Sequence, residues 1–84
     1  MKKISIFGST GSIGSSLLNI IKKDKKAFDI KLLTANKNYK KLIKQAKFFN
    51  VKNIILTNNK SFLIASNLLK NNEIKVFLII FNNF

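Results

Sequence analysis

The sequence predicts an α/β fold, in which a parallel β-sheet with flanking helices is built from about three βα units. Short apolar runs alternate with segments whose apolar residues recur at helical spacing, which is typical of βαβ units with right-handed crossovers. In addition, all three glycines of the chain lie in one seven-residue window, GSTGSIG at 8–14, directly after the first apolar run. The 84 residues leave room for one small domain or for part of a larger one.

The first half of the chain contains two predicted strands and one predicted helix. Residues 4–7, ISIF, form a short apolar run that ends at a glycine, as a buried parallel strand before a tight turn would. A helix is predicted to follow the glycines and to end at about residue 23. Its apolar positions share one helical face: Ile13, Leu17, Ile20 and Ile21. After a polar break, residues 28–35, FDIKLLTA, are the second strand candidate.

The second half of the chain repeats this alternation. A loop at 36–38 precedes a second predicted helix, and residues 53–57, NIILT, are the third strand candidate. The apolar residues of the second helix recur at helical spacing: Tyr39, Leu42, Ile43, Ala46 and Phe49. A third helix is expected from Ser61, a suitable N-cap residue, to Leu69. Its apolar face consists of Phe62, Ala65 and Leu69.

The end of the chain departs from this pattern. Residues 74–81 could form a fourth strand, but no helix follows to cover it. An apolar tail over 74–84 would equally result from a truncated gene or a slip of the reading frame. We therefore expect no internal boundary before residue 73 and leave both explanations of the tail open.

Composition excludes several function classes. The chain has no cysteine and no histidine, so disulfides, thiolate metal sites and a cysteine nucleophile are absent. The net charge is +13, but all sixteen basic residues are lysines spread over every segment, whereas base readout favours arginine. We therefore expect no nucleic-acid partner. No apolar run reaches the length of a signal peptide or a membrane span, so we expect a cytoplasmic protein without a membrane partner.

The glycine window follows a predicted strand and opens a predicted helix, which is the setting of a dinucleotide-binding fingerprint. Gly8 would allow a turn with positive φ, Gly11 a close approach of the backbone to a ligand, and Gly14 tight packing of the helix. The new helix would direct its unpaired N–H groups at a pyrophosphate. The pattern therefore favours a Rossmann-like, cofactor-binding fold over a glycine-rich turn that only tightens packing.

The end of the second strand indicates which cofactor is bound. An NAD enzyme places an Asp or Glu about 20 residues after the glycines, to bind the ribose 2′-hydroxyl. Here that place reads TANKN at 34–38, and none of the three acidic residues lies there. A lysine between two amides suits a 2′-phosphate, so we predict NADPH over NADH. The alternative is that Lys37 is one more solvated lysine in a lysine-rich chain.

The segments KISIF at 3–7, GSTGSIG at 8–14 and TANKN at 34–38 resemble the amino terminus of the 1-deoxy-D-xylulose 5-phosphate reductoisomerase family. The resemblance covers roughly residues 1–60 and ends by about residue 73. It implies an oxidoreductase of non-mevalonate isoprenoid biosynthesis, which converts this sugar phosphate to 2-C-methyl-D-erythritol 4-phosphate. It further implies NADPH, a divalent cation such as Mg²⁺ or Mn²⁺, and a homodimer for the complete enzyme.

Carried over by position, the resemblance implies two groups of cofactor-binding residues. Those expected at the cofactor phosphates are Thr10, Gly11, Ser12 and Ile13. Those expected at the adenosine end are Asn36, Lys37 and Asn38. The family's N-K-E and S-E-H segments and its carboxylate cluster are missing, so we expect no catalytic or metal-binding residue in this chain. Residues 1–73 would be the amino-terminal part of an NADPH-binding domain that cannot catalyse the reaction alone.

Three other hypotheses remain open at this point. The chain could belong to another NADP-dependent reductase with the same glycine turn. It could be a small basic protein that binds nucleic acid through charge, although it lacks arginine and interleaved aromatic residues. It could also be a remnant without function, because an incomplete sheet exposes an edge that invites aggregation.

Overall fold

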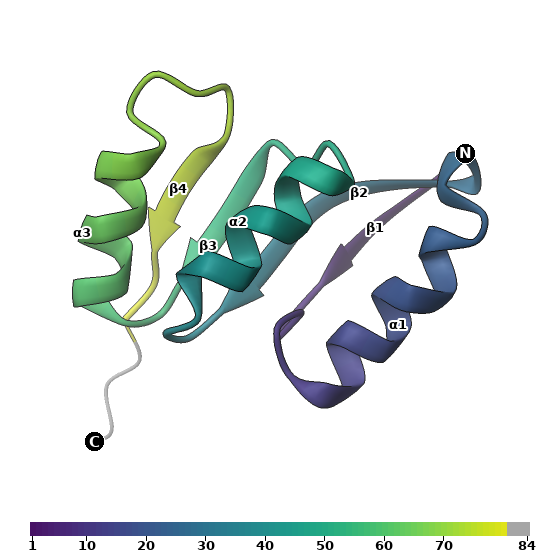
Figure 1. Cartoon of the computed structure of the whole chain (residues 1–84), viewed down its shortest axis with the longest axis horizontal. Coiled ribbons are helices and arrows are strands. Elements are labelled where there is room, and N and C mark those ends of the chain that lie inside the picture. The colour runs from purple at the N-terminus through teal and green to yellow at the C-terminus, as the bar shows by residue number, and fades with distance from the viewer. Residues whose placement is uncertain (81–84) are drawn as a thin grey trace.

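The computed structural model describes residues 1–80, which form a four-stranded sheet with helices between successive strands (Figure 1). The strands are β1 (Lys2–Ile6), β2 (Phe28–Ala35), β3 (Asn53–Leu56) and β4 (Lys75–Leu78). The helices are α1 (Ser12–Lys22), α2 (Tyr39–Phe48) and α3 (Asn59–Leu68), with a 3₁₀ turn, η1, at Lys25–Ala27. The strand order is β1-β2-β3-β4, and every pair is parallel. The predicted α/β fold is confirmed.

All four strands run in the same direction, so their carboxyl ends meet at one edge of the sheet, the lower edge in Figure 1. The turns that begin α1, α2 and α3 all lie along this edge. The glycine window follows β1, and the loop at 36–38 follows β2. Because β1 and β2 are neighbouring strands, the two loops lie side by side although they are distant in sequence. In open α/β sheets, ligands bind outside this edge.

The core lies between the sheet and the helices that pack on it. Helix α2 packs on β2 and β3, and α3 packs on β3 and β4. Strand residues that face the helices alternate with residues of the other face, and the buried ones include Leu33, Ile54 and Leu56. From α2, Leu42 and Ala46 are fully buried against them, as its helical spacing predicted. None of the helices in this part of the chain has the length and apolar character needed to cross a membrane.

The orientation of α1 differs from the expected one. The buried residues are Gly14, Leu18 and Ile21, whereas Ile13 and Ile20 are 88% and 65% exposed. Only Ile21 of the expected apolar face is buried, so that prediction was wrong for the other three residues. The reason is that Gly14 packs directly on the backbone of Gly8, and this contact sets the rotation of the helix.

The start of α3 also differs by a few residues from the prediction. Asn58 is the N-cap, because its Oδ1 accepts a hydrogen bond from the Ser61 N–H at 3.0 Å. Ser61, the predicted cap, lies inside the helix, is buried, and donates its hydroxyl to the Lys37 carbonyl oxygen at 3.0 Å. An Asn earlier in the chain is an equally good cap, and helical periodicity cannot distinguish the two.

Part of the predicted fourth strand is present. Lys75–Leu78 form β4, in register with β3, so that Ile54 lies beside Val76 and Leu56 beside Leu78. Phe81, the last residue of the predicted strand, lies outside the described residues. The segment at 75–78 therefore extends the sheet instead of forming a separate tail.

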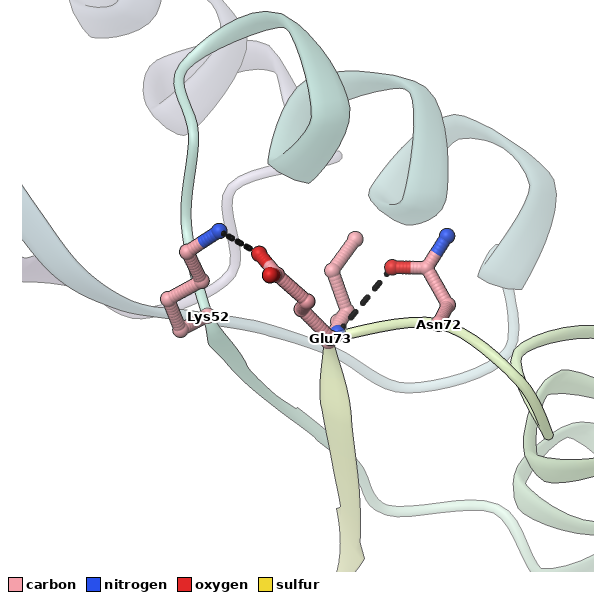
Figure 2. A network of polar contacts seen from close by, with 4 residues as sticks. Lys52, Asn72 and Glu73 are labelled. Carbon is pink, nitrogen blue, oxygen red and sulfur yellow. Dashed lines mark hydrogen bonds and ion pairs between the residues drawn. The ribbon is translucent and has the colours of Figure 1, made fainter.

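An ion pair joins β3 and β4 at the edge opposite the glycine window. Figure 2 shows the Lys52 ammonium beside the Glu73 carboxylate. The two groups are 2.5 Å apart, and Asn72 Oδ1 accepts a hydrogen bond from the N–H of Ile74, two residues further along the chain. The hydrogen bond from Lys52, followed by its charge, lowers the pKa of Glu73. Both side chains are exposed, so the pair adds little to stability.

We expect this pair to give a small acid dependence of stability. Because the pKa of Glu73 is lower in the folded than in the unfolded chain, the contribution is present above the unfolded pKa and is lost as pH falls through the folded pKa. An NMR titration of the Glu73 carboxyl should show the lowered pKa in the wild type and an ordinary one in Lys52→Met. Equal pKa values in the two proteins would contradict the pairing.

Candidate functional site

The glycine loop, residues 7–11, joins β1 to α1, and its first glycine has the conformation that the sequence predicts. Gly8 has φ of +68°, the left-handed region that favours glycine. The prediction of a tight turn at Gly8 is therefore confirmed. The close helix contact predicted for Gly14 is also confirmed, because a Cβ there would lie 2.4 Å from the Gly8 oxygen.

Gly11 differs from the other two glycines, because the chain's own packing does not require it. It is the N-cap of α1, with φ −77° and ψ 177°, a conformation open to any residue. A Cβ built on it would meet only the Gly8 oxygen, at 3.5 Å, which is an ordinary contact. A glycine at this place therefore leaves open space at the helix start.

The amino terminus of α1 has free hydrogen-bond donors. Asn38 caps α2 by accepting from the Lys41 N–H at 3.2 Å, and Asn58 caps α3, whereas Gly11 provides no side-chain cap to α1. Within residues 1–80, the N–H groups of Ser12, Ile13 and Gly14 donate no hydrogen bond. With the positive end of the helix dipole, these groups can bind an anion.

An open hollow of about 630 Å³ lies against this helix start. Its lining includes Gly8, Gly11, Ser12 and Ile13, together with Phe7, which directly follows β1. The Ile13 side chain is exposed and contributes apolar surface to this hollow. The hollow thus combines free backbone donors with apolar side chains, as a small-molecule site requires.

The asparagine loop, residues 36–38, follows β2 at the same edge of the sheet. The Thr57 hydroxyl donates to Asn36 Oδ1 at 2.9 Å, and Asn38 Oδ1 is the cap of α2. The side-chain oxygens of both asparagines therefore have partners, which leaves their amide NH₂ groups as donors. Lys37 lies between them and is exposed. The loop presents donors and one positive charge.

A hydrogen-bond network that the sequence did not indicate joins the glycine loop to β2 and α2, the two elements that flank the asparagine loop. The Gly8 N–H donates to Thr34 Oγ1 and the Ser9 N–H to the Thr34 carbonyl oxygen, both at 2.9 Å. Ser9 is fully buried, and its hydroxyl donates to Gln45 Oε1 at 2.8 Å. The Lys41 ammonium donates to the Thr10 carbonyl oxygen at 3.1 Å. Ser9 and Thr34 lie in the quoted GSTGSIG and TANKN segments, but neither was predicted to pair with another residue, and Lys41 and Gln45 lie outside both segments.

The distribution of charge favours an anionic ligand at this edge. All three carboxylates of the chain belong to the opposite edge: Asp24 follows α1, Asp29 begins β2 and Glu73 precedes β4. Asp29 pairs with Lys31 at 2.7 Å, and Glu73 with Lys52. Over the described part of the chain, no three His, Cys, Asp or Glu residues form a group that could hold a metal ion.

The structure places all seven predicted site residues at this one edge, in two groups. Thr10, Gly11, Ser12 and Ile13 lie on the glycine loop and the first turn of α1, and residues 36–38 follow β2. The contact of Lys41 with Thr10 shows that the start of α2 reaches the glycine loop. The assignment of these residues to a cofactor stays a prediction.

Comparison with known proteins identifies the relatives of this chain. The model of the 1-deoxy-D-xylulose 5-phosphate reductoisomerase family matches residues 4–82. The chain is 70% identical, over all 84 residues, to the enzyme of that name from Pelagibacter ubique, and 43% identical over 75 residues to the one from Buchnera aphidicola. It spans 21% and 19% of these two relatives. The match reaches residue 82, so the expectation that the resemblance ends by about residue 73 was wrong.

Solved structures of reductoisomerases have the same fold. The Zymomonas mobilis enzyme in complex with NADPH matches 92% of this chain, and 20% of its own length, with a TM-score of 0.85 and 27% identity. A reductoisomerase with fosmidomycin and magnesium matches 93% of the chain, and 19% of its own, with a TM-score of 0.80 and 26% identity. These matches support the reductoisomerase hypothesis and not the alternatives to it.

Proposed function

Since the chain belongs to the 1-deoxy-D-xylulose 5-phosphate reductoisomerase family, we propose that it is the amino-terminal part of an NADPH-binding domain, with residues 1–73 inside that domain. The observation that supports this function is the uncapped start of α1 beside Gly11, where neither a side chain nor a Cβ occupies the space in front of three free N–H groups. A pyrophosphate fits this place by charge and by hydrogen bonding. The matched Zymomonas mobilis enzyme is a complex with NADPH.

In the proposed complex, the chain binds and orients the cofactor. The backbone N–H groups at Ser12 and Ile13, with the hydroxyls of Thr10 and Ser12, would hold the phosphates, and Gly11 would let them approach. Asn36, Lys37 and Asn38 would hold the adenosine end. When bound, NADPH supplies the hydride of the reduction.

The chain spans about a fifth of the length of the relatives it matches, so the reaction itself is proposed for the full-length protein. That protein would convert 1-deoxy-D-xylulose 5-phosphate to 2-C-methyl-D-erythritol 4-phosphate. Residues 1–80 offer no cluster of metal-binding side chains, so a divalent cation would be bound by other parts of the protein. A cytoplasmic homodimer without nucleic-acid or membrane partners stays a prediction.

Titration of the chain with NADPH and with NADH tests the proposed cofactor. We expect tighter binding of NADPH, and Lys37→Ala should weaken it about 10- to 100-fold while leaving NADH binding nearly unchanged, because a hydrogen bond to a charged group contributes about 1.5–3 kcal/mol. Lys70→Ala, which removes one charge just beyond the carboxyl end of α3, is the control. Equal affinity of the wild type for both cofactors would exclude Lys37 from this role.

A further inference from the structure

We propose that Gln45, on α2, is a positioning residue that holds the glycine loop in its phosphate-binding conformation through a reciprocal pair of hydrogen bonds with Ser9. This inference rests on the proposed function and names a residue outside the seven predicted ones. Gln45 itself would not contact the cofactor. It acts through the loop that does.

The reciprocal pair uses both ends of the Gln45 amide. The Ser9 hydroxyl donates to Gln45 Oε1 at 2.8 Å, and Gln45 Nε2 donates to the Ser9 carbonyl oxygen at 2.9 Å. Ser9 is 0% exposed, so an unsatisfied group there would be costly. The Ser15 hydroxyl, from α1, donates to the same carbonyl oxygen at 3.2 Å. Gln45 therefore satisfies a donor and an acceptor of one buried loop residue.

The orientation of the Ser9 carbonyl determines where the next N–H points. In a trans peptide, the C=O and N–H groups point in opposite directions, and the structure contains no cis peptide bond in residues 1–80. Because the Ser9 oxygen points to Gln45, the Thr10 N–H is directed away from α2. This N–H donates no hydrogen bond within the described residues. It adds a free donor to those at the start of α1.

The same helix also connects the two ends of the proposed site. Helix α2 begins after Asn38, whose side chain caps it, and two turns later Gln45 contacts the glycine loop. Those seven residues span about 10 Å of helix. Lys41 lies between them and donates to the Thr10 carbonyl oxygen at 3.1 Å. Gln45 thus fixes the glycine loop relative to the loop that would bind the 2′-phosphate.

The test compares two ligands in Gln45→Met, a variant of similar side-chain length without hydrogen-bonding groups. NADPH contacts both loops, whereas adenosine 2′-monophosphate would contact only the asparagine loop. By NMR titration of the full chain, we expect the Kd of NADPH to rise about tenfold or more and the Kd of adenosine 2′-monophosphate to change less than twofold. Asn67→Met, which replaces an exposed amide on α3, should change neither.

A second variant separates positioning from stability. Gln45→Met leaves the buried Ser9 hydroxyl without its strong partner, so it will lower the melting temperature. Adding Ser9→Ala removes that hydroxyl and should restore much of the stability, while NADPH binding stays weak because the Ser9 carbonyl lacks the Gln45 donor. Recovery of stability and NADPH affinity together would show a merely structural role and overturn the inference.

Two further outcomes distinguish a failure of the inference about Gln45 from a failure of the proposed function. If the wild type binds NADPH and folded Gln45→Met binds it equally well, the inference is wrong and the proposed function stands. If the wild type binds neither NADPH nor adenosine 2′-monophosphate, the proposed function fails and the inference fails with it.

Discussion

Gly14→Ala is expected to lose most of the stability of this small domain. A Cβ at this position would lie 2.4 Å from the Gly8 oxygen and 2.6 Å from the Ser9 Cα. Both are backbone atoms, so no side-chain rotation can relieve the overlap, and α1 must move away from the loop. Overpacking of this kind costs about 1–3 kcal/mol and occasionally more, whereas alanine's better helix propensity returns about 1 kcal/mol. Because both overlaps are with backbone atoms, we expect a cost above this range, about 4 kcal/mol, and therefore a net loss of about 3 kcal/mol.

Thermal unfolding followed by circular dichroism measures this loss. For a chain of this size, about 3 kcal/mol corresponds to a fall in Tm of about 12–24 °C. Gly11→Ala is the matched control, because its Cβ meets only an ordinary contact at 3.5 Å, and its Tm should fall by a few degrees at most. If both variants melted at the same temperature, the close packing of α1 on the glycine loop would be wrong.

The packing of Gly14 also shows why the sequence predicted the elements of the fold but not the rotation of α1. Apolar periodicity identified all four strands and three helices to within a few residues, because most elements bury the face that is apolar. In α1, three of the four residues predicted to form the apolar face, at 13, 17 and 20, lie on the exposed side, while Leu18 and Ile21 are buried. The helix is oriented by a residue without a side chain, and hydrophobic periodicity gives glycine no weight.

The sequence predicted those parts of the site that are short continuous motifs, but not the contacts between residues far apart in the chain. The glycine spacing and the TANKN segment are short motifs with known mechanics, and both lie at the expected edge of the sheet. The bond between Ser9 and Gln45 joins residues 36 positions apart, in a loop and a helix. Ser9 lies in the glycine window, but nothing in that motif shows that its side chain is buried, and nothing around Gln45 distinguishes it from a solvated glutamine. Such contacts depend on the register of α2 against β2, which only the folded structure provides.

The N-cap position of α1 gives the sharpest test of where the phosphates bind. Gly11 has the extended conformation of an N-cap, so an aspartate there can accept hydrogen bonds from the N–H groups of Ile13 and Gly14. A carboxylate at this end of the helix dipole also lowers the strong positive charge of the chain. We therefore expect Gly11→Asp to stabilise the fold by about 1 kcal/mol, a few tenths from capping and the rest from the helix dipole, and to raise the Tm by about 4–8 °C.

The same substitution should nearly abolish NADPH binding. The new carboxylate would occupy the donors that the pyrophosphate needs, and its charge would repel the phosphates, so we expect the affinity to fall by about 100-fold or more, equivalent to about 2.7 kcal/mol. Titration with NADPH and a melting curve on one sample measure both effects. Asn67→Asp, which adds the same charge on α3 far from the site, should leave the affinity nearly unchanged. A more stable Gly11→Asp variant that still binds NADPH as the wild type does would place the phosphates away from the start of α1.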